Sequence, residues 1–197
     1  MLGEEGAALL NNAGARAMIE HHRLLYRDLA DPLALLRDDR QSSTTLSQFW
    51  RYAANAEAAS ESAPDVAQYS QLMAASQAMV CEQVIAAYGF SSSHRVLDIG
   101  GGMAVFAGAL AQRHPELEVG IFDLPGVVEN AAARLAVDAP AASIDMHGGD
   151  FFRDPLPDGY DTMSLVRILH DHDDEPAQVL LNRIHAALPC EGRLLIA

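Results

Sequence analysis

A short apolar run that meets three glycines and then a helical pattern constrains the fold of this chain more than any other feature. The run covers residues 95–99, the glycines are Gly100, Gly101 and Gly102, and the helical pattern begins at Val105. Glycine adopts positive φ and lets the backbone come close to a ligand, and the free N–H groups that open a helix favour electron-rich groups. The stretch therefore predicts a strand, a tight turn and a helix around a nucleotide-like cofactor.

Apolar runs of strand length alternate with helical patterns through the second half of the chain. Strands separated by helices indicate right-handed βαβ units and a parallel sheet with helices on both faces. We therefore predict an α/β fold for residues 63–197. A helical segment with a break at Asp31 and Pro32 is expected over residues 1–62, because its apolar residues recur at helical spacing. The expected strands are 94–99, 119–123, 143–146, 161–166 and 193–197, and the expected helices of the α/β part are 66–88, 105–112, 127–137 and 177–188.

Composition narrows the classes of partner and compartment. The 197 residues include 13 Lys and Arg against 27 Asp and Glu, for a net charge of −14. This charge repels a phosphate backbone, so nucleic acid is not expected as a partner. The two cysteines, Cys81 and Cys190, match neither a metal-ligand spacing nor a disulfide framework. Residues 1–6 lack the basic start and apolar core of a signal peptide, so we predict a cytoplasmic protein.

Acidic residues stand at the ends of three consecutive expected strands, at Asp98, Asp123 and Asp150. Ligands of open parallel sheets bind at the carboxyl ends of the strands, so these acids should surround one cleft. Asp123 lies 21 residues beyond Gly102, where a carboxylate can accept both hydroxyls of a ribose. A cap for the following helix is the other interpretation of Asp123, and the two roles are compatible. A nicotinamide-binding turn has a third glycine where Val105 stands, which disfavours that alternative.

Four motifs follow one another along the chain: LDIGGG at residues 97–102, FDLP at 122–125, GGDFF at 148–152 and LHD at 169–171. In order and spacing they resemble the small-molecule O-methyltransferases of the caffeate and acetylserotonin type. The resemblance implies a Rossmann-like domain that binds S-adenosylmethionine (SAM). It also implies an N-terminal helical dimerisation domain, of which residues 1–62 are expected to be a remnant, and therefore a homodimer.

The same resemblance assigns cofactor contacts to residues of these motifs. Gly100 and Gly102 line the methionine part of SAM, and Asp123 holds the ribose. Asp150 and Phe151 bracket the adenine, where Phe151 replaces the usual methionine but still offers an apolar side chain to the adenine face. The remaining expected cofactor contacts are Asp98, Leu124 and Arg167.

His170 is the catalytic base that the resemblance implies. The sulfonium of SAM makes the methyl electrophilic, so the enzyme has to align the acceptor oxygen with it and remove a proton. Imidazole accepts protons near neutral pH. The acidic run that ends at Glu175 also invites a metal site, but acids there suit the first turn of a helix, and no metal is expected.

Three features depart from the family. Val166 stands where the plant enzymes have a lysine, with Arg167 one place later on the opposite face of the expected strand. His172 replaces a tryptophan. The acidic neighbour of the base would follow Ala197, so we expect a truncated chain that is inactive by itself.

Further patterns add to the four motifs: HH at residues 21–22, DLADP at 28–32, FW at 49–50 and VRILHDHD at 166–173, which extends the LHD motif on both sides. Together they are similar to the hydroxyneurosporene O-methyltransferases of purple phototrophic bacteria. That branch methylates the tertiary 1-hydroxyl of acyclic carotenoids, so we expect an apolar polyene acceptor that is met at a membrane surface. Phenolic acceptors, a NAD-dependent oxidoreductase and a non-catalytic SAM-binding module remain as alternatives.

Overall fold

The computed structural model describes residues 3–37, 44–46, 77–138 and 143–197, which belong to two units, residues 1–77 and 78–197. The expected domain boundary between residues 62 and 63 lies outside the described residues, as does the first part of the helix expected over 66–88. Across the described ranges no helix is long and apolar enough to cross a membrane.

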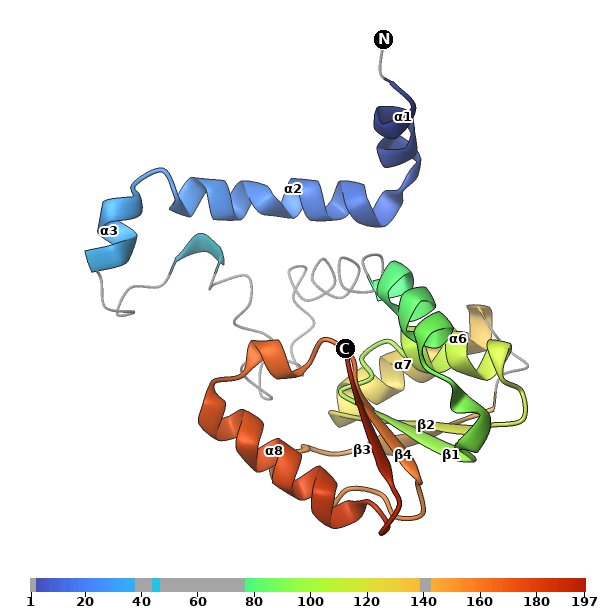
Figure 1. Cartoon of the computed structure of the whole chain (residues 1–197). Coiled ribbons are helices and arrows are strands. Elements are labelled where there is room, and N and C mark those ends of the chain that lie inside the picture. Colours follow the sequence, from blue (N-terminus) through green and yellow to red (C-terminus); the bar gives the residue numbers. More distant parts are fainter. Residues whose placement is uncertain (1–2, 38–43, 47–76, 139–142) are drawn as a thin grey trace. The chain divides into compact units, whose positions relative to one another are not determined.

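Three helices form most of the described part of the first unit (Figure 1). Asn12 separates the first two, and its Oδ1 accepts a hydrogen bond from the Ala15 N–H (2.9 Å), which caps the start of the second. Asp31 caps the third in the same way, because its Oδ1 accepts from the Ala34 N–H (3.0 Å). The predicted helices and the break at Asp31 and Pro32 are thus confirmed for residues 4–37, whereas residues 38–43 and 47–62 of the predicted segment lie outside the described residues. The helices are α1 Glu4–Asn11, α2 Ala13–Asp28 and α3 Pro32–Arg37.

The second unit contains a five-stranded parallel sheet in the order β3-β2-β1-β4-β5 (Figure 1). The chain runs from β1 outward to β3 and then returns to the other side of β1 as β4. The order therefore reverses between β1 and β4, which is where open α/β sheets bind ligands. All five predicted strands are present, with β1 at Arg95–Ile99, β2 at Glu118–Asp123, β3 at Ile144–Gly148, β4 at Thr162–Leu165 and β5 at Arg193–Ile196.

Helices cover both faces of this sheet (Figure 1). Apolar side chains form one core on each face. Residues 77–87, α6 (Val105–Arg113) and α7 (Pro125–Asp138) pack on one face, and α8 (Asp174–Ala187) packs on the other. Side chains alternate along β1, so Val96 belongs to the first core and Leu97 and Ile99 to the second. The same alternation directs Asp98 toward the face that carries α6 and α7. The described part of the second unit also contains the short 3-10 helices η2 Phe90–Ser92 and η3 Leu169–Asp171.

Candidate cofactor site

The turn between β1 and α6 is held in conformations that favour glycine. Gly100 and Gly102 have φ of 70° and 54°, and Ala104, which precedes α6, has φ of 57°. A Cβ on Gly100 would lie 2.5 Å from Cδ1 of Ile168, whereas a Cβ on Gly102 would meet nothing within 4 Å. The backbone at Gly100 is therefore covered by a side chain, and the backbone at Gly102 is open to a ligand.

Asp123, the last residue of β2, bridges two loops with its carboxylate. Its Oδ2 accepts a hydrogen bond from the Gly102 N–H (2.8 Å), and its Oδ1 accepts from the Leu124 N–H (2.7 Å). Burial raises the pKa of Asp123, and the two backbone N–H donors oppose that increase. The α7 helix begins two residues later, at Pro125. The Asp123 carboxylate points to the glycine turn, so its hydrogen bond to Gly102 connects this turn to the end of β2.

Asp98 lies beneath the glycine turn with a side chain only 1% exposed. Its Oδ1 accepts a hydrogen bond from Oγ of Ser164 (2.7 Å), the residue opposite it on β4. Its Oδ2 is buried without a hydrogen-bond partner among the described residues and would lie 3.1 Å from a Cβ on Gly101. Burial raises the pKa of Asp98 to about 7; the bond from Ser164 opposes this, and the charge of Asp123 adds to it. A buried carboxyl with an unpaired oxygen is costly unless it holds a proton or lies near a positive charge.

The loop after β3 is fixed by its own acid and by α8. Asp150 Oδ1 accepts a hydrogen bond from the Phe152 N–H (2.8 Å), and Asp150 Oδ2 lies 3.5 Å from Nε of the exposed Arg153. Arg183 of α8 donates from Nε to the backbone oxygen of Phe151 (2.8 Å). The backbone of residues 150–152 is thus held in place, because its polar groups are engaged from both sides.

The side chain of Phe151 belongs to an aromatic cluster that lies beside the glycine turn. The rings of Phe151 and Phe152 meet edge to face at 4.7 Å, and the His172 ring packs against them at 5.9 and 5.1 Å. Cε1 of Phe151 would lie 3.7 Å from a Cβ on Gly100, beside Ile168. Phe151 and Ile168 therefore form an apolar cover over Gly100.

His170 lies on η3, beyond the end of β4. Its side chain is 58% exposed, and its Nε2 is 3.3 Å from Oδ1 of Asp171. Ile168, which precedes η3, packs on Gly100, so His170 stands two residues from the side chain that covers the glycine turn. Arg167 has φ of 61°, and its N–H donates to the oxygen of Ala197 (2.6 Å). The predicted place of Arg167 on a strand face is wrong, because the chain leaves β4 at Leu165 and turns toward η3.

The predicted site residues come from strand ends and loops at one edge of the sheet. Hydrogen bonds link Gly102, Asp123 and Leu124. Asp98 Oδ2 lies against Gly101 of the same turn, and the Phe151 ring reaches Gly100. Asp150 fixes the loop that carries Phe151, while His170 and Arg167 arrive from the β4 side. In the described part of the chain, no three His, Cys, Asp or Glu side chains are arranged to hold a metal ion.

Sequence reasoning missed four residues that shape the site: Ser164, Ile168, His172 and Arg183. Ser164 has a recognisable signal, since it is a polar residue within the apolar strand β4. The other three act through contacts between distant segments, which no local pattern reveals.

The described residues fit a nucleoside ligand that carries a positive charge. The open backbone at Gly102 can accommodate a close approach, and the Asp123 carboxylate can accept hydroxyls. The unpaired Oδ2 of Asp98 would be stabilised by a nearby cation. SAM has both properties, because it is a nucleoside with ribose hydroxyls and its sulfonium is cationic.

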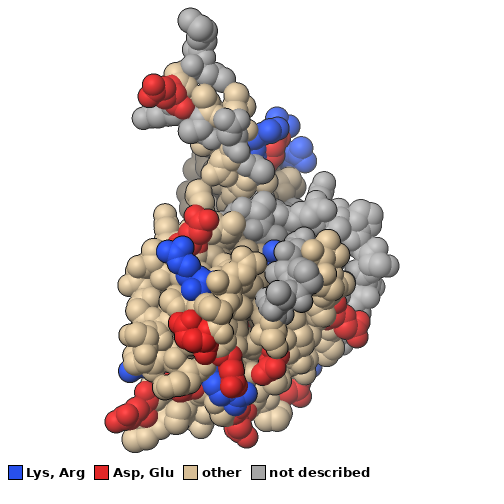
Figure 2. Space-filling model, turned by 90° about the vertical axis from the view of Figure 1, so that its right-hand side faces the viewer, with Lys and Arg blue, Asp and Glu red and all other residues tan. Residues whose placement is uncertain are grey.

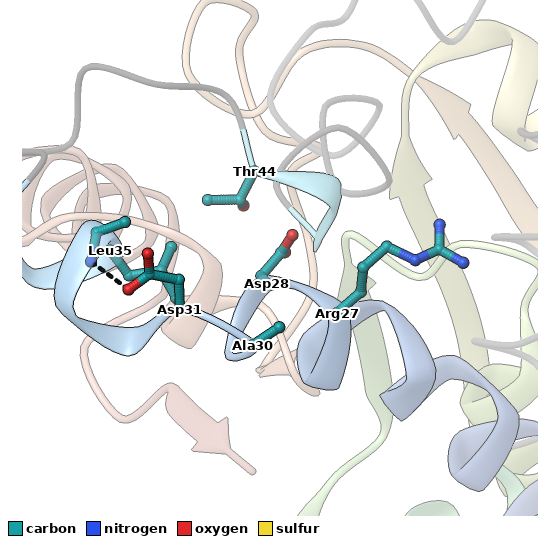
Figure 3. A pocket seen from close by; sticks show the side chains of 7 residues that line it. Arg27, Asp28, Ala30, Asp31, Leu35 and Thr44 are labelled. Carbon is teal, nitrogen blue, oxygen red and sulfur yellow. Dashed lines mark hydrogen bonds between the residues drawn. The ribbon is translucent and has the colours of Figure 1, made fainter.

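A hollow of about 340 Å³ in the first unit is lined by the end of α2, by α3 and by Thr44 (Figure 3). Its acids hold backbone rather than face a ligand: Asp28 accepts hydrogen bonds from the Thr45 and Leu46 N–H groups (2.9 and 2.7 Å), and Asp31 caps α3. We therefore assign the hollow a structural role.

On the face of the molecule in Figure 2, acidic and basic side chains are intermingled among the described residues.

Comparison with known proteins gives one family. The family model for the O-methyltransferase domain matches residues 26–197. The chain is 43% identical over 197 residues to the demethylspheroidene O-methyltransferase of Cereibacter sphaeroides, covering 100% of this chain and 51% of that protein. It is 41% identical over 196 residues to the enzyme of the same name from Rhodobacter capsulatus, covering 100% and 48%. The chain thus spans about half the length of these curated relatives.

Among solved structures, PigF with SAH superposes on 100% of this chain and 55% of its own length. The TM-score is 0.64 and the sequence identity is 25%.

Proposed function

This chain belongs to the O-methyltransferase domain family, and on that premise we propose a function for the full-length protein. It transfers a methyl group from SAM to the 1-hydroxyl of an acyclic carotenoid. The similarity of the whole chain to two demethylspheroidene O-methyltransferases carries this proposal. The glycine turn, bridged by the Asp123 carboxylate and open at Gly102, independently supports the binding of SAM.

The residues of the glycine turn and its neighbours bind and orient the cofactor. Asp123 accepts the ribose hydroxyls, because each carboxylate oxygen has a lone pair left after accepting one backbone N–H. Phe151 offers an aromatic face to the adenine, with Asp150 fixing the loop behind it. Gly102 and Leu124 line the methionine and ribose parts with backbone, and Gly100 allows the tight turn beneath Ile168 that places Gly102 there. Asp98 and Arg167 supply charge. PigF, which was solved with SAH, supports this choice of cofactor.

His170 acts as the general base. When bound, SAM supplies an electrophilic methyl on its sulfonium, so the protein has to position the acceptor hydroxyl and take its proton. A tertiary alcohol is far less acidic than imidazolium, so its proton leaves as the carbon–oxygen bond forms. The exposed His170 side chain can meet an incoming substrate, and Asp171 Oδ1, which lies 3.3 Å from Nε2, can orient the imidazole ring.

An assay with two classes of acceptor tests the proposal. The full-length protein is incubated with labelled SAM and either a 1-hydroxy acyclic carotenoid in detergent micelles or a catechol. We expect a 1-methoxy carotenoid and no methylated catechol. Turnover of the catechol alone would move the protein to the phenolic branch. SAM binding without turnover of either would favour a non-catalytic module, and tight NAD binding without SAM binding would indicate an oxidoreductase.

The full-length protein is further proposed to be a cytoplasmic homodimer that meets its acceptor at a membrane surface. Large apolar side chains are exposed along α1–α3, including Leu9, Leu10, Ile19, Leu33 and Leu36. An apolar polyene partitions into lipid, so an enzyme that uses it has to contact that phase. Light scattering measures whether the protein is a dimer, and flotation with carotenoid-loaded vesicles measures whether it binds a membrane surface. A monomer, or a protein that stays entirely below the vesicle layer, contradicts the corresponding part of this proposal.

A further inference from the structure

The most unusual group in the described chain is the carboxyl of Asp98. It is 1% exposed, no described residue donates a hydrogen bond to its Oδ2, and that oxygen lies against Gly101 in the proposed cofactor turn. Its single hydrogen bond comes from the neutral hydroxyl of Ser164. Oδ2 is shielded from solvent and receives no hydrogen bond from the described residues, so burial favours the protonated form of this carboxyl.

The groups that face Asp98 from the neighbouring elements do not offset its charge. Asp123 on β2 is itself acidic and raises the pKa of Asp98 further. Cys81, on the helical residues 77–87, is a buried thiol whose pKa rises to about 12 through burial and through the charge of Asp98, so it stays neutral. Arg167 acts on Cys81 in the opposite direction. The surroundings of Asp98 therefore lack a cation that touches the carboxyl within the described residues.

We propose that Asp98 holds a proton while the cofactor cleft is empty and releases it when SAM binds, so that the cleft distinguishes SAM from S-adenosylhomocysteine (SAH). This inference rests on the proposed function. Binding of cationic SAM to the neutral acid yields the carboxylate, the bound cation and one free proton, so charge is conserved. SAH has a neutral sulfur and leaves the acid protonated. Transfer of the methyl group removes the positive charge that stabilised the carboxylate, after which Asp98 takes up a proton again and favours release of the product.

Calorimetry of SAM and SAH binding to the full-length protein in two buffers with different ionisation enthalpies counts the protons released. With the pKa of Asp98 near 7, SAM should release about half a proton at pH 7 and SAH close to none. The ratio of SAM affinity to SAH affinity should rise from pH 6 to pH 7, by at most about tenfold, and level off above pH 8. The ratio isolates the sulfonium, because the two ligands share all other ionisable groups.

Three variants attribute the proton to Asp98. In Asp98→Asn the ratio should not depend on pH, whereas His170→Gln should keep the wild-type dependence. Ser164→Ala removes the donor that stabilises the Asp98 carboxylate, so the pH at which the affinity ratio levels off should be higher than in the wild type. This variant tests the assignment to Asp98 if Asp98→Asn does not fold. Equal proton release by SAM and SAH in a wild-type protein that binds both overturns this inference and leaves the proposed function standing. Failure of the wild type to bind SAM overturns both.

Discussion

The backbone N–H of Gly102 donates a hydrogen bond to Oδ2 of Asp123 over 2.8 Å. This contact joins the turn that follows β1 to the end of β2. The other carboxylate oxygen accepts from the Leu124 N–H at 2.7 Å, so one side chain sets the positions of two loops. Asp123 is thus a structural part of the cleft as well as its proposed ribose ligand.

Asp123→Ala should weaken SAM binding by about 1–3 kcal/mol, because the ribose hydroxyls and the Gly102 N–H lose their common acceptor. Asp123→Asn keeps the shape with one oxygen acceptor and should lose less. Calorimetric titration of both variants measures the difference. Unchanged SAM affinity in the alanine variant would remove Asp123 from the cofactor site.

Alanine at Gly100 and at Gly102 should have different effects. Both positions have positive φ, so each substitution strains the backbone by about 1–2 kcal/mol. Gly100→Ala also drives a Cβ to 2.5 Å from Cδ1 of Ile168, and it should lower the unfolding free energy more than Gly102→Ala does. Gly102→Ala projects into open space, so its main loss should be in SAM affinity. Denaturant unfolding and calorimetry measure the two effects, and equal losses of stability would contradict the contact with Ile168.

Ala104→Gly should cost the protein little or no stability. Ala104 is fully buried with φ of 57°, a conformation that costs a residue with a Cβ about 1–2 kcal/mol. Glycine relieves this strain, but it loses about 0.5–1 kcal/mol in entropy and about 0.8 kcal/mol from the buried methyl, so the terms nearly cancel. Unfolding in urea measures the change in stability, with Ala107→Gly in α6 as the control that should destabilise. A loss of stability in Ala104→Gly as large as in the control would contradict the left-handed conformation.

His170→Ala in the full-length protein should reduce methyl transfer by about 10²–10⁴ while SAM affinity survives, since general-base assistance contributes on this order. His185→Ala provides a matched control, because His185 is an exposed histidine on α8 and should leave the rate unchanged. Single-turnover rates and SAM titrations separate chemistry from binding. Near-normal turnover in His170→Ala would mean that the reaction depends on positioning alone.

Asp98→Asn should stabilise the cofactor-free protein at pH 8 more than at pH 5. Burial raises the pKa of Asp98 to about 7 in the folded state from 3.8. Between these values the unfolded chain loses the proton that the folded protein keeps, so wild-type stability falls as pH rises, by up to about 1.4 kcal/mol per pH unit. Asparagine does not titrate and avoids this loss. Urea unfolding at the two pH values measures the difference, and a stability difference independent of pH would show that Asp98 is ionised throughout.

The sequence by itself determined the elements and their kind. Apolar runs bounded by turn residues predicted all five strands, because burial on both faces of a parallel sheet requires continuous apolar segments. Three glycines before a helical pattern predicted the turn at residues 100–102, because positive φ there excludes most other residues. The acids at Asp98 and Asp123 and the α/β class followed from the same local patterns.

Only the tertiary structure decided what these acids touch. Asp98 and Ser164 are 66 residues apart and meet because the strand order places β4 beside β1. Ile168 covers Gly100, and His172 packs on Phe151, because the chain turns at Arg167 into η3 instead of continuing as a strand. A local pattern records which residues favour a strand or a turn. The environment of a buried carboxyl depends on the order in which distant strands assemble, and so does its charge.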